Sequence, residues 1–278
     1  MEFKNAFIDL IKRRTSSRTY ESKDIESETL QKLKNFIADI NKEINTKARF
    51  MVINNDNNNK GSKKLGTYGV ISGADSFIIG ILDKNDNNAF EFGYFFEKII
   101  LYATDLGLQT CWLGGTFNKD DFAQNTDITE NEFIPIVSPV GYKKEKPRIV
   151  ETAMRAAAGS NHRKPWNELF YDKDIQNPLK EKDAGSYAVL LEMVRLGPSA
   201  SNKQPWRIIK NNNEFHFFIS RTKGYGLASY DMQLNDIGIA KCHFELSAKE
   251  LGLKGQWQKL NNIKTPEDWE YVTSWIAD

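Results

Sequence analysis

The chain has 278 residues, which is enough for one large domain or two of medium size. Its 38 lysines and arginines nearly balance 37 aspartates and glutamates. This balance argues against general binding to nucleic acids or to anionic membranes, because both need an excess or a patch of positive charge. The hydrophobic content of 40% and charged content of 27% are typical of soluble globular proteins.

The sequence predicts a cytoplasmic protein without a metal site or a membrane segment. No apolar run approaches the roughly 18 residues that a transmembrane helix needs, and residues 1–14 lack the apolar core of a signal peptide. Cys111 and Cys242 form no Cys-x-x-Cys pair, and the three histidines are not at zinc-binding spacing. Both cysteines are therefore expected to be small buried residues.

Apolar periodicity predicts alternating helices and strands in the first part of the chain. The expected helices cover residues 3–12, a segment that starts with Ser27 as its cap and ends near residue 44, and residues 89–106. Asn118 should cap a short helix, and residues 150–158 should form another. Strands are expected at residues 49–53 and 77–82. A further strand at 133–140 contains Pro135 and Pro139, which indicates an edge or irregular position.

The second part begins after the polar stretch 172–183, which has the composition of a linker. A helix is expected at 187–196, strands at 207–209 and 215–219, and a long helix at 234–251. Thr265 and Pro266 resemble a helix start, and residues 271–276 a last strand. The glycines of residues 65–73 do not match a dinucleotide-binding fingerprint, and they precede a strand instead of following one.

Two segments of the chain align without a gap, at a constant offset of 145 residues. Residues 91–112 match residues 236–257, and seven of the 22 positions are identical, including Gly93/Gly238 and Trp112/Trp257. This repeat suggests two fused copies of one unit that mimic a symmetric dimer. The alternative is two unrelated helices that both end at a glycine.

Three short motifs and a basic turn have the chemistry of a ligand site. Residues 198–206, Pro-Ser-Ala-Ser-Asn-Lys-Gln-Pro-Trp, offer hydroxyl, amide and backbone N–H groups between a helix and a strand. Arg14, Ser16 and Arg18 stand at alternate positions and suit a phosphate. The third motif is the turn Trp112-Leu113-Gly114-Gly115, and Arg163 and Lys164 form the basic turn. The alternative reading of the 198–206 segment is a well-capped connection without a ligand.

These segments resemble motifs of the FMN-dependent nitroreductase family: Pro-Ser-x-x-Asn-x-Gln-Pro-Trp, Arg-x-Ser-x-Arg and Trp-Ile/Leu-Gly-Gly. The resemblance extends from about residue 11 to residue 257 and is nearest to single-chain members with two halves. It implies an α+β nitroreductase-like fold in which the halves, residues 1–175 and 176–278, mimic the family homodimer within one monomer. Thr15 departs from the family pattern, which usually has a second arginine there.

The resemblance also implies which residues contact FMN. The phosphate would be bound by Arg14, Ser16 and Arg18, with Arg163 and Lys164 adding positive charge. The backbone of Leu113, Gly114 and Gly115 would approach the N5 edge of the ring, and Lys63 and Lys64 would lie near its O2 side. Tyr68 and Gly69 would form part of the wall. The ring and ribityl chain would contact Pro198, Ser199, Ala200, Ser201 and Asn202, with Gln204 nearby.

No residue has the context of a nucleophile or general base, which fits a cofactor that carries the reaction itself. The implied activity is an FMN-dependent NAD(P)H oxidoreductase with a ping-pong cycle. NADH or NADPH would give a hydride to flavin N5 and leave, and a nitroaromatic, quinone or similar small-molecule acceptor would then bind. The alternatives are a flavin-binding electron carrier without turnover and a partner-binding protein on a degenerate fold. Retention of all the motifs argues against the second alternative.

Overall fold

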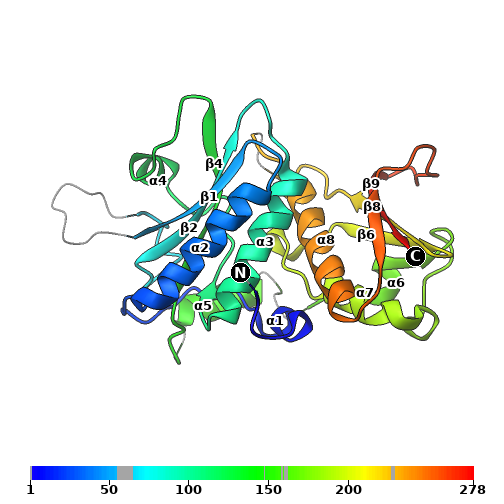
Figure 1. Ribbon diagram of the computed structural model, residues 1–278, viewed down its shortest axis with the longest axis horizontal. Helices are drawn as coiled ribbons and strands as arrows, with labels where there is room; N and C mark the ends of the chain where they lie inside the picture. Colours follow the sequence, from blue (N-terminus) through cyan, green and yellow to red (C-terminus); the bar gives the residue numbers. More distant parts are fainter. Residues whose placement is uncertain (1, 55–64, 147, 158, 160–161, 227–228) are drawn as a thin grey trace.

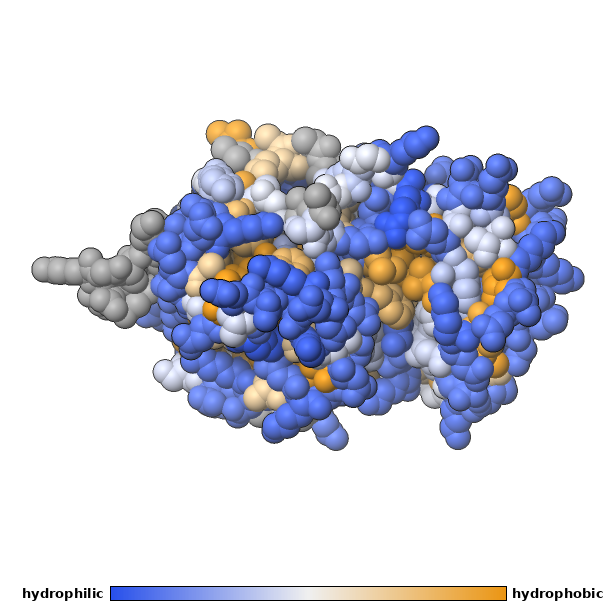
Figure 2. Space-filling view, turned by 90° about the horizontal axis from the view of Figure 1, so that it is seen from above, coloured by the Kyte–Doolittle hydropathy of each residue, from blue (hydrophilic) through white to orange (hydrophobic). Residues whose placement is uncertain are grey.

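The computed structural model describes residues 2–54, 65–146, 148–157, 159, 162–226 and 229–278. Two β-sheets lie at opposite ends of the molecule, and two long helices, α3 (Ala89–Asp105) and α8 (Met232–Glu250), lie side by side between them (Figure 1). Seen from above, most of the surface is hydrophilic, and an apolar area lies near the middle (Figure 2). Lys63 and Lys64, predicted near the ligand, fall outside the described residues.

The first sheet is antiparallel with the order β1-β2-β4-β3, formed by β1 (Ala48–Asn54), β2 (Ser76–Asp83), β4 (Glu132–Gly141) and β3 (Gln109–Thr110). Helix α2 (Ser27–Glu43) packs beside β1 and α3, and Phe50, Phe92 and Phe96 fill the core there. A second apolar cluster around Phe77 and Phe122 lies near the short helix α4 (Lys119–Gln124). Strand β2 is therefore buried on both faces, which explains its continuous apolar sequence.

The second sheet has the order β5-β6-β7-β9-β8. Strands β6 (Trp206–Asn211), β7 (Glu214–Ser220), β9 (Trp269–Ala277) and β8 (Gly255–Gln258) are antiparallel and occur in the same chain order across the sheet as β1, β2, β4 and β3. β5 (Phe170–Asp172) adds a parallel strand beside β6. Residues 170–172, which the predicted boundary assigns to the first half, thus pair with the second sheet.

Short helices complete this end of the molecule and lead into the sheet. They are α6 (Trp166–Leu169), the 3₁₀ turns η1 (Glu181–Asp183) and η2 (Gly185–Tyr187), α7 (Ala188–Arg195) and the 3₁₀ turn η3 (Ala200–Asn202). Helix α7 packs on α8, and its buried face consists of Leu190, Leu191, Met193 and Val194. The aromatic residues Phe244, Trp257 and Trp275 pack edge to face beneath the sheet.

Two glycines allow α3 and α8 to approach closely. A Cβ atom on Gly93 would lie 2.2 Å from the carbonyl oxygen of Asn235, and one on Gly238 would lie 2.0 Å from that of Phe90. The two contacts mirror each other. The offset of 145 residues relates Gly93 to Gly238 and Phe90 to Asn235, so each glycine faces the counterpart of the residue that the other glycine faces. Backbone-to-backbone packing of the two helices thus explains why both positions are glycine.

The N-terminal segment is anchored at the ends of these central helices. Asp105 accepts hydrogen bonds from the backbone N–H groups of Lys4 and Asn5, and Glu250 accepts one from Ile8. Helix α1 (Phe7–Arg13) packs against both α3 and α8. Helix α5 (Ile149–Ala157) follows the first sheet. Within the described residues, no helix is long and apolar enough to span a membrane.

Most predicted elements of the first part exist, with three corrections. The first helix, expected at residues 3–12, begins only at Phe7. Ser27 is the first residue of α2 and not its cap; the preceding Glu26 makes no capping hydrogen bond through its side chain. Strand β4 is not at an edge, because it lies between β2 and the short β3. The expected irregularity is present: the pairing of β2 with β4 shifts between Gly80 and Leu82, opposite Pro135.

The second part also differs from expectation in three places. Residues 172–183 are not an open linker, since Leu179 is buried and hydrogen bonds to Phe170. No helix begins at Thr265; the chain there turns directly into β9. Strand β8, which follows α8, had no clear apolar alternation and was not predicted. The last strand is confirmed as β9, although it starts two residues earlier.

We expect that Gly93→Ala and Gly238→Ala each lower the free energy of unfolding by about 1–3 kcal/mol, although alanine is the better helix former. The added methyl group would meet the backbone of the facing helix, which cannot rotate away. Urea denaturation followed by circular dichroism measures the effect. Gly115→Ala is the matched control, because a Cβ there meets no atom within 4 Å; equal stability of all three variants would contradict the close crossing.

Candidate functional site

A cavity of about 1010 Å³ brings together segments that are far apart in the sequence. Its walls come from the end of α1 and the strand-like segment after it, the turn after β3, α5, the loop before β6, the loop after β7 and the first turns of α8. The first half of the chain supplies residues 11–18, 112–116 and 154–155, and the second half supplies residues 196–203 and 232–239.

The alternate spacing of Arg14, Ser16 and Arg18 is explained by an extended backbone. Ser16 forms a parallel bridge with Thr110 of β3, and the N–H of Ser17 donates to the Thr110 carbonyl at 2.9 Å. Successive side chains of extended backbone point in opposite directions. Arg14, Ser16 and Arg18 line the cavity, whereas Ser17 is buried and donates its hydroxyl to Gln109.

Of the arginines at this end of the cavity, Arg14 is buried and Arg18 and Arg163 are half-buried. In the described part of the chain, the Nε of Arg14 and the Nε and Nη1 of Arg18 are buried without a hydrogen-bond partner. Burial lowers the pKa of Arg14, and nearby Arg155 lowers it further. Burial, and then the charge of Arg14, lower the pKa of Arg163 to about 10. Clustered cations with unused donors fit an anionic group.

The loop before β6 is strained and is held in place by several hydrogen bonds. Ser201, Asn202 and Gln204 have positive φ angles of 46°, 55° and 48°. This region costs a residue other than glycine on the order of 1–2 kcal/mol, less for asparagine. Both carboxylate oxygens of Asp236 accept from the N–H of Ala200, at 3.2 and 3.1 Å, and Ser199 Oγ accepts from the N–H of Gln204 at 2.9 Å.

Asn202 and Gln204 tie this loop to the basic turn near residue 163. Asn202 Nδ2 donates to the carbonyls of Gly159 and His162 at 2.7 and 2.8 Å, and its Oδ1 accepts from Arg163 at 3.1 Å. Gln204 Oε1 accepts from the N–H of Lys164 at 2.9 Å. The two amide side chains therefore position Arg163 at the cavity.

The two glycines after β3 have different environments. A Cβ on Gly114 would lie 2.5 Å from Met232 Cε and 3.1 Å from Ile136 Cδ1, so the flexible ends of these side chains would have to move. A Cβ on Gly115 would meet nothing within 4 Å and would enter the cavity. Both glycines line the cavity, and their close approach to a ligand stays a prediction.

Twelve of the predicted site residues line the cavity: Arg14, Ser16, Arg18, Leu113, Gly114, Gly115, Arg163, Pro198, Ser199, Ala200, Ser201 and Asn202. Three do not. Tyr68 is 71% exposed, Gln204 is buried behind the loop, and Lys164 contributes its backbone N–H to Gln204 instead of its side chain to the cavity. The chain thus gathers both predicted motif groups around one space.

Several residues of the wall were missed by the sequence analysis. Arg155 extends from α5 and donates to the carbonyl of Ser16 at 3.1 Å. Tyr225 reaches from the loop after β7 and donates its hydroxyl to Ser201 at 2.8 Å. Asp236 lies inside the sequence repeat, and its burial raises the pKa of its carboxyl well above the usual range. Only Asp236 had a sequence signal, its acidic match to Glu91.

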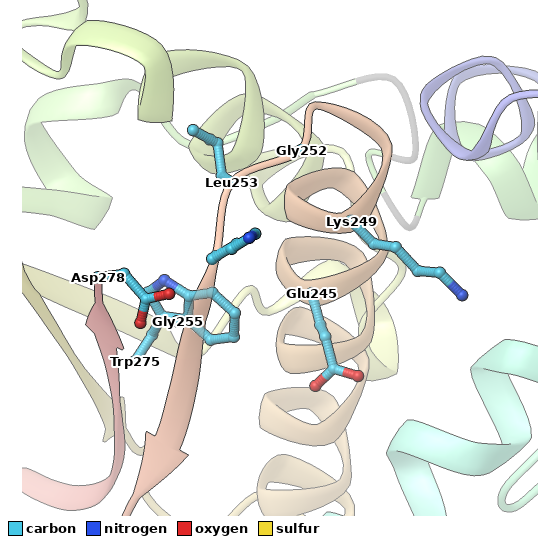
Figure 3. Close-up of a pocket in the computed structure, with 8 residues that line it drawn as sticks. Glu245, Lys249, Gly252, Leu253, Gly255, Trp275 and Asp278 are labelled. Atoms are coloured by element: carbon cyan, nitrogen blue, oxygen red, sulfur yellow. The ribbon is translucent and has the colours of Figure 1, made fainter.

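A second, smaller cavity of about 400 Å³ lies beside the C-terminal end of α8 (Figure 3). Glu245 and Lys249 extend from the helix, Trp275 comes from β9 and Asp278 follows that strand. Lys249 points away from Trp275 and Asp278. No residue of the motifs lines this cavity, and its charges are of both signs. Among the described residues, no group of three or more histidine, cysteine, aspartate or glutamate side chains could hold a metal ion.

Comparisons with known proteins identify the family and the fold of the chain. A family model described as "Putative TM nitroreductase" matches residues 6–248. The structure is similar to that of a nitroreductase from Thermotoga maritima MSB8, with 18% identity, a TM-score of 0.60, and coverage of 99% of this chain and 95% of that one. No curated protein matches the sequence.

Nitroreductases of ordinary length match only about half of the chain. A nitroreductase family protein from Clostridium difficile 630 has 22% identity and a TM-score of 0.43, and the match covers 60% of this chain and 96% of that one. A nitroreductase with bound FMN from Bacteroides fragilis NCTC 9343 has 20% identity and a TM-score of 0.39, covering 52% and 92%. Because the family model spans most of the sequence, the chain belongs to the nitroreductase family of oxidoreductases and has its α+β fold.

Proposed function

We propose that the protein is an FMN-dependent NAD(P)H oxidoreductase with one FMN in the large cavity. The observation that carries this proposal is the set of buried, unpartnered guanidinium N–H groups of Arg14 and Arg18 at one end of the cavity. A phosphate would satisfy these donors, and Ser16 and Arg163 line the same space. The void at Gly115 would accept a flat ring.

The residues of the chain would bind, orient and shield the cofactor. The loop from Pro198 to Asn202 would contact the ring and the ribityl chain, with its strained conformation maintained by Asp236. Val70, Ile136 and Met154 add apolar surface to the wall, which would exclude water from part of the site. Bound FMN would supply the hydride-accepting and hydride-donating chemistry, so the protein needs no nucleophile or general base of its own.

We further propose that the chain is a fused pseudo-dimer, with halves close to residues 1–175 and 176–278, and that it acts as a monomer. Support comes from the matching strand order of the two sheets and from the reciprocal contacts of Gly93 and Gly238. The pairing of β5 with β6 favours a boundary a few residues before Trp166. Each half contributes a different motif group to the same cavity.

The reaction we propose is a ping-pong transfer of a hydride from NADH or NADPH to an acceptor such as a nitroaromatic compound or a quinone. Both molecules would use the same cavity in turn. NAD(P)H should therefore bleach the visible absorbance of the FMN-loaded protein under anaerobic conditions, and a quinone should restore it. Flavin that stays oxidised with both NADH and NADPH would instead indicate a flavin-binding carrier or a partner-binding protein.

One FMN should bind per chain, and the Arg14→Ala/Arg18→Ala variant should lose it. A charge-assisted phosphate contact contributes about 1.5–3 kcal/mol, so losing two should weaken binding by roughly 10²- to 10⁴-fold. Calorimetric titration of apoprotein gives both stoichiometry and affinity. Riboflavin, which lacks the phosphate, is the control and should bind both proteins equally. Two FMN per chain, or unchanged FMN affinity, would contradict the assignment.

Gly115→Ala should weaken FMN binding by about 5- to 100-fold, corresponding to the ~1–3 kcal/mol of an overpacked contact. Its unfolding temperature without FMN should equal that of the original protein, because the methyl group meets no protein atom. In Gly114→Ala the methyl group would displace the flexible end of Met232, so the unfolding temperature should fall less than in Gly93→Ala, where the methyl group meets backbone. Full FMN affinity in Gly115→Ala would place the ring elsewhere in the cavity.

A further inference from the structure

A buried polar network lies directly behind Arg14. Glu97 of α3 and His243 of α8 are both fully buried, and Glu97 Oε1 is 2.9 Å from His243 Nε2. The other oxygen, Oε2, accepts a hydrogen bond from Trp112 Nε1 at 2.9 Å. Arg14 Nε is 3.7 Å from Oε1, too far for a hydrogen bond. The network thus joins both central helices to the cationic end of the cavity.

The geometry determines how many protons this network holds. His243 Nδ1 lies 2.8 Å from the carbonyl oxygen of Met193, which can only accept, so Nδ1 must carry a hydrogen. The contact between Nε2 and Glu97 Oε1 then needs a second proton, because neither atom would otherwise be a donor. The indole N–H of Trp112 and the charge of Arg14 both stabilise the carboxylate. This second proton lies in the contact between Glu97 and His243, so the pair as a whole carries no net charge.

The charge of this pair affects Arg14. Glu97 alone would neutralise Arg14, and a buried carboxylate would compete with an anionic ligand for the guanidinium. The proton that His243 shares with Glu97 offsets the carboxylate, so that the three residues together keep one positive charge. Arg155 and Arg163 also lie near Arg14 and add positive charge. Cys111 and Cys242 lie beside the network as well, and burial raises the pKa of both thiols, which keeps them neutral.

We propose that His243, a residue of the second half, is a positioning residue for the phosphate subsite: it offsets the charge of Glu97 and so keeps Arg14 available to an anionic ligand. The inference rests on the proposed FMN site. It assigns to His243 an effect on cofactor affinity through Glu97 and Arg14, without contact between the histidine and the cofactor.

The first test is His243→Gln, which keeps a polar side chain of similar size but cannot hold the second proton that offsets Glu97. FMN should bind about 10-fold more weakly, because one unit of charge near a phosphate is lost. Riboflavin affinity should not change, since it has no phosphate. His216→Gln is the matched control: His216 is also buried and hydrogen-bonded, to Ser274, but lies in β7 of the second sheet. This control should bind FMN as the original protein does.

The second test is restoration of affinity. In Glu97→Gln, the amide can accept from Trp112 and donate to a neutral His243, so Arg14 keeps its charge and FMN affinity should stay within about 2-fold. Glu97→Gln/His243→Gln should likewise recover the affinity that His243→Gln loses, because no carboxylate faces Arg14. A purely structural role would make the double variant worse and would weaken riboflavin binding equally.

Three results would overturn the inference: unchanged FMN affinity in His243→Gln, no recovery in the double variant, or a tenfold loss in Glu97→Gln. If His243→Gln does not fold, the FMN affinity of Glu97→Gln still tests the inference, because a tenfold loss there would overturn it. Failure of the original protein to bind FMN would instead contradict the proposed function, so the two failures are distinguishable.

Discussion

The close crossing of α3 and α8 is the constraint on which the rest of the structure depends. Because Gly93 and Gly238 have no side chains, the backbones of the helices meet, and the sheets on either side are held at a fixed separation. The cavity forms beside this crossing, where the first turns of α8 face the turn after β3. Asn235, whose carbonyl oxygen faces Gly93, and its neighbour Asp236 both line the cavity.

The cavity concentrates features that reduce stability. The charges of Arg14 and Arg163 repel each other, and the loop before β6 contains three residues at positive φ. Within the described residues, several guanidinium N–H groups have no hydrogen-bond partner. A folded protein tolerates such losses of stability where many surrounding interactions hold the strained residues in place. Here Asp236, Ser199 and the amides of Asn202 and Gln204 fix the loop, while the bridge between Ser16 and Thr110 fixes the arginines. A ligand with a phosphate would remove much of the electrostatic cost.

The sequence predicted elements correctly where neighbouring residues determine their structure. Helix α3, strand β2 and the Asn118 cap were predictable because periodicity and capping depend on neighbouring residues. Thr265 and Pro266 failed as a helix start because the following segment pairs with β7 in the sheet, and tertiary pairing overrides the weak preference of a Thr-Pro pair. Strand β8 was missed because its pairing with β9, not its own pattern, makes it a strand.

The sequence by itself determined the family, the repeat and most of the residues that meet at the cavity, because each motif is a short run with its own chemistry. Only the tertiary structure decided what those residues do there. It assigned Gln204 to a tether, Gly114 to contact with Met232, and Tyr68 to the surface. It also brought Arg155, Asp236 and the Glu97–His243 pair to the site. Contacts between residues more than a hundred positions apart leave no pattern in a single sequence, because they depend on how the two central helices cross.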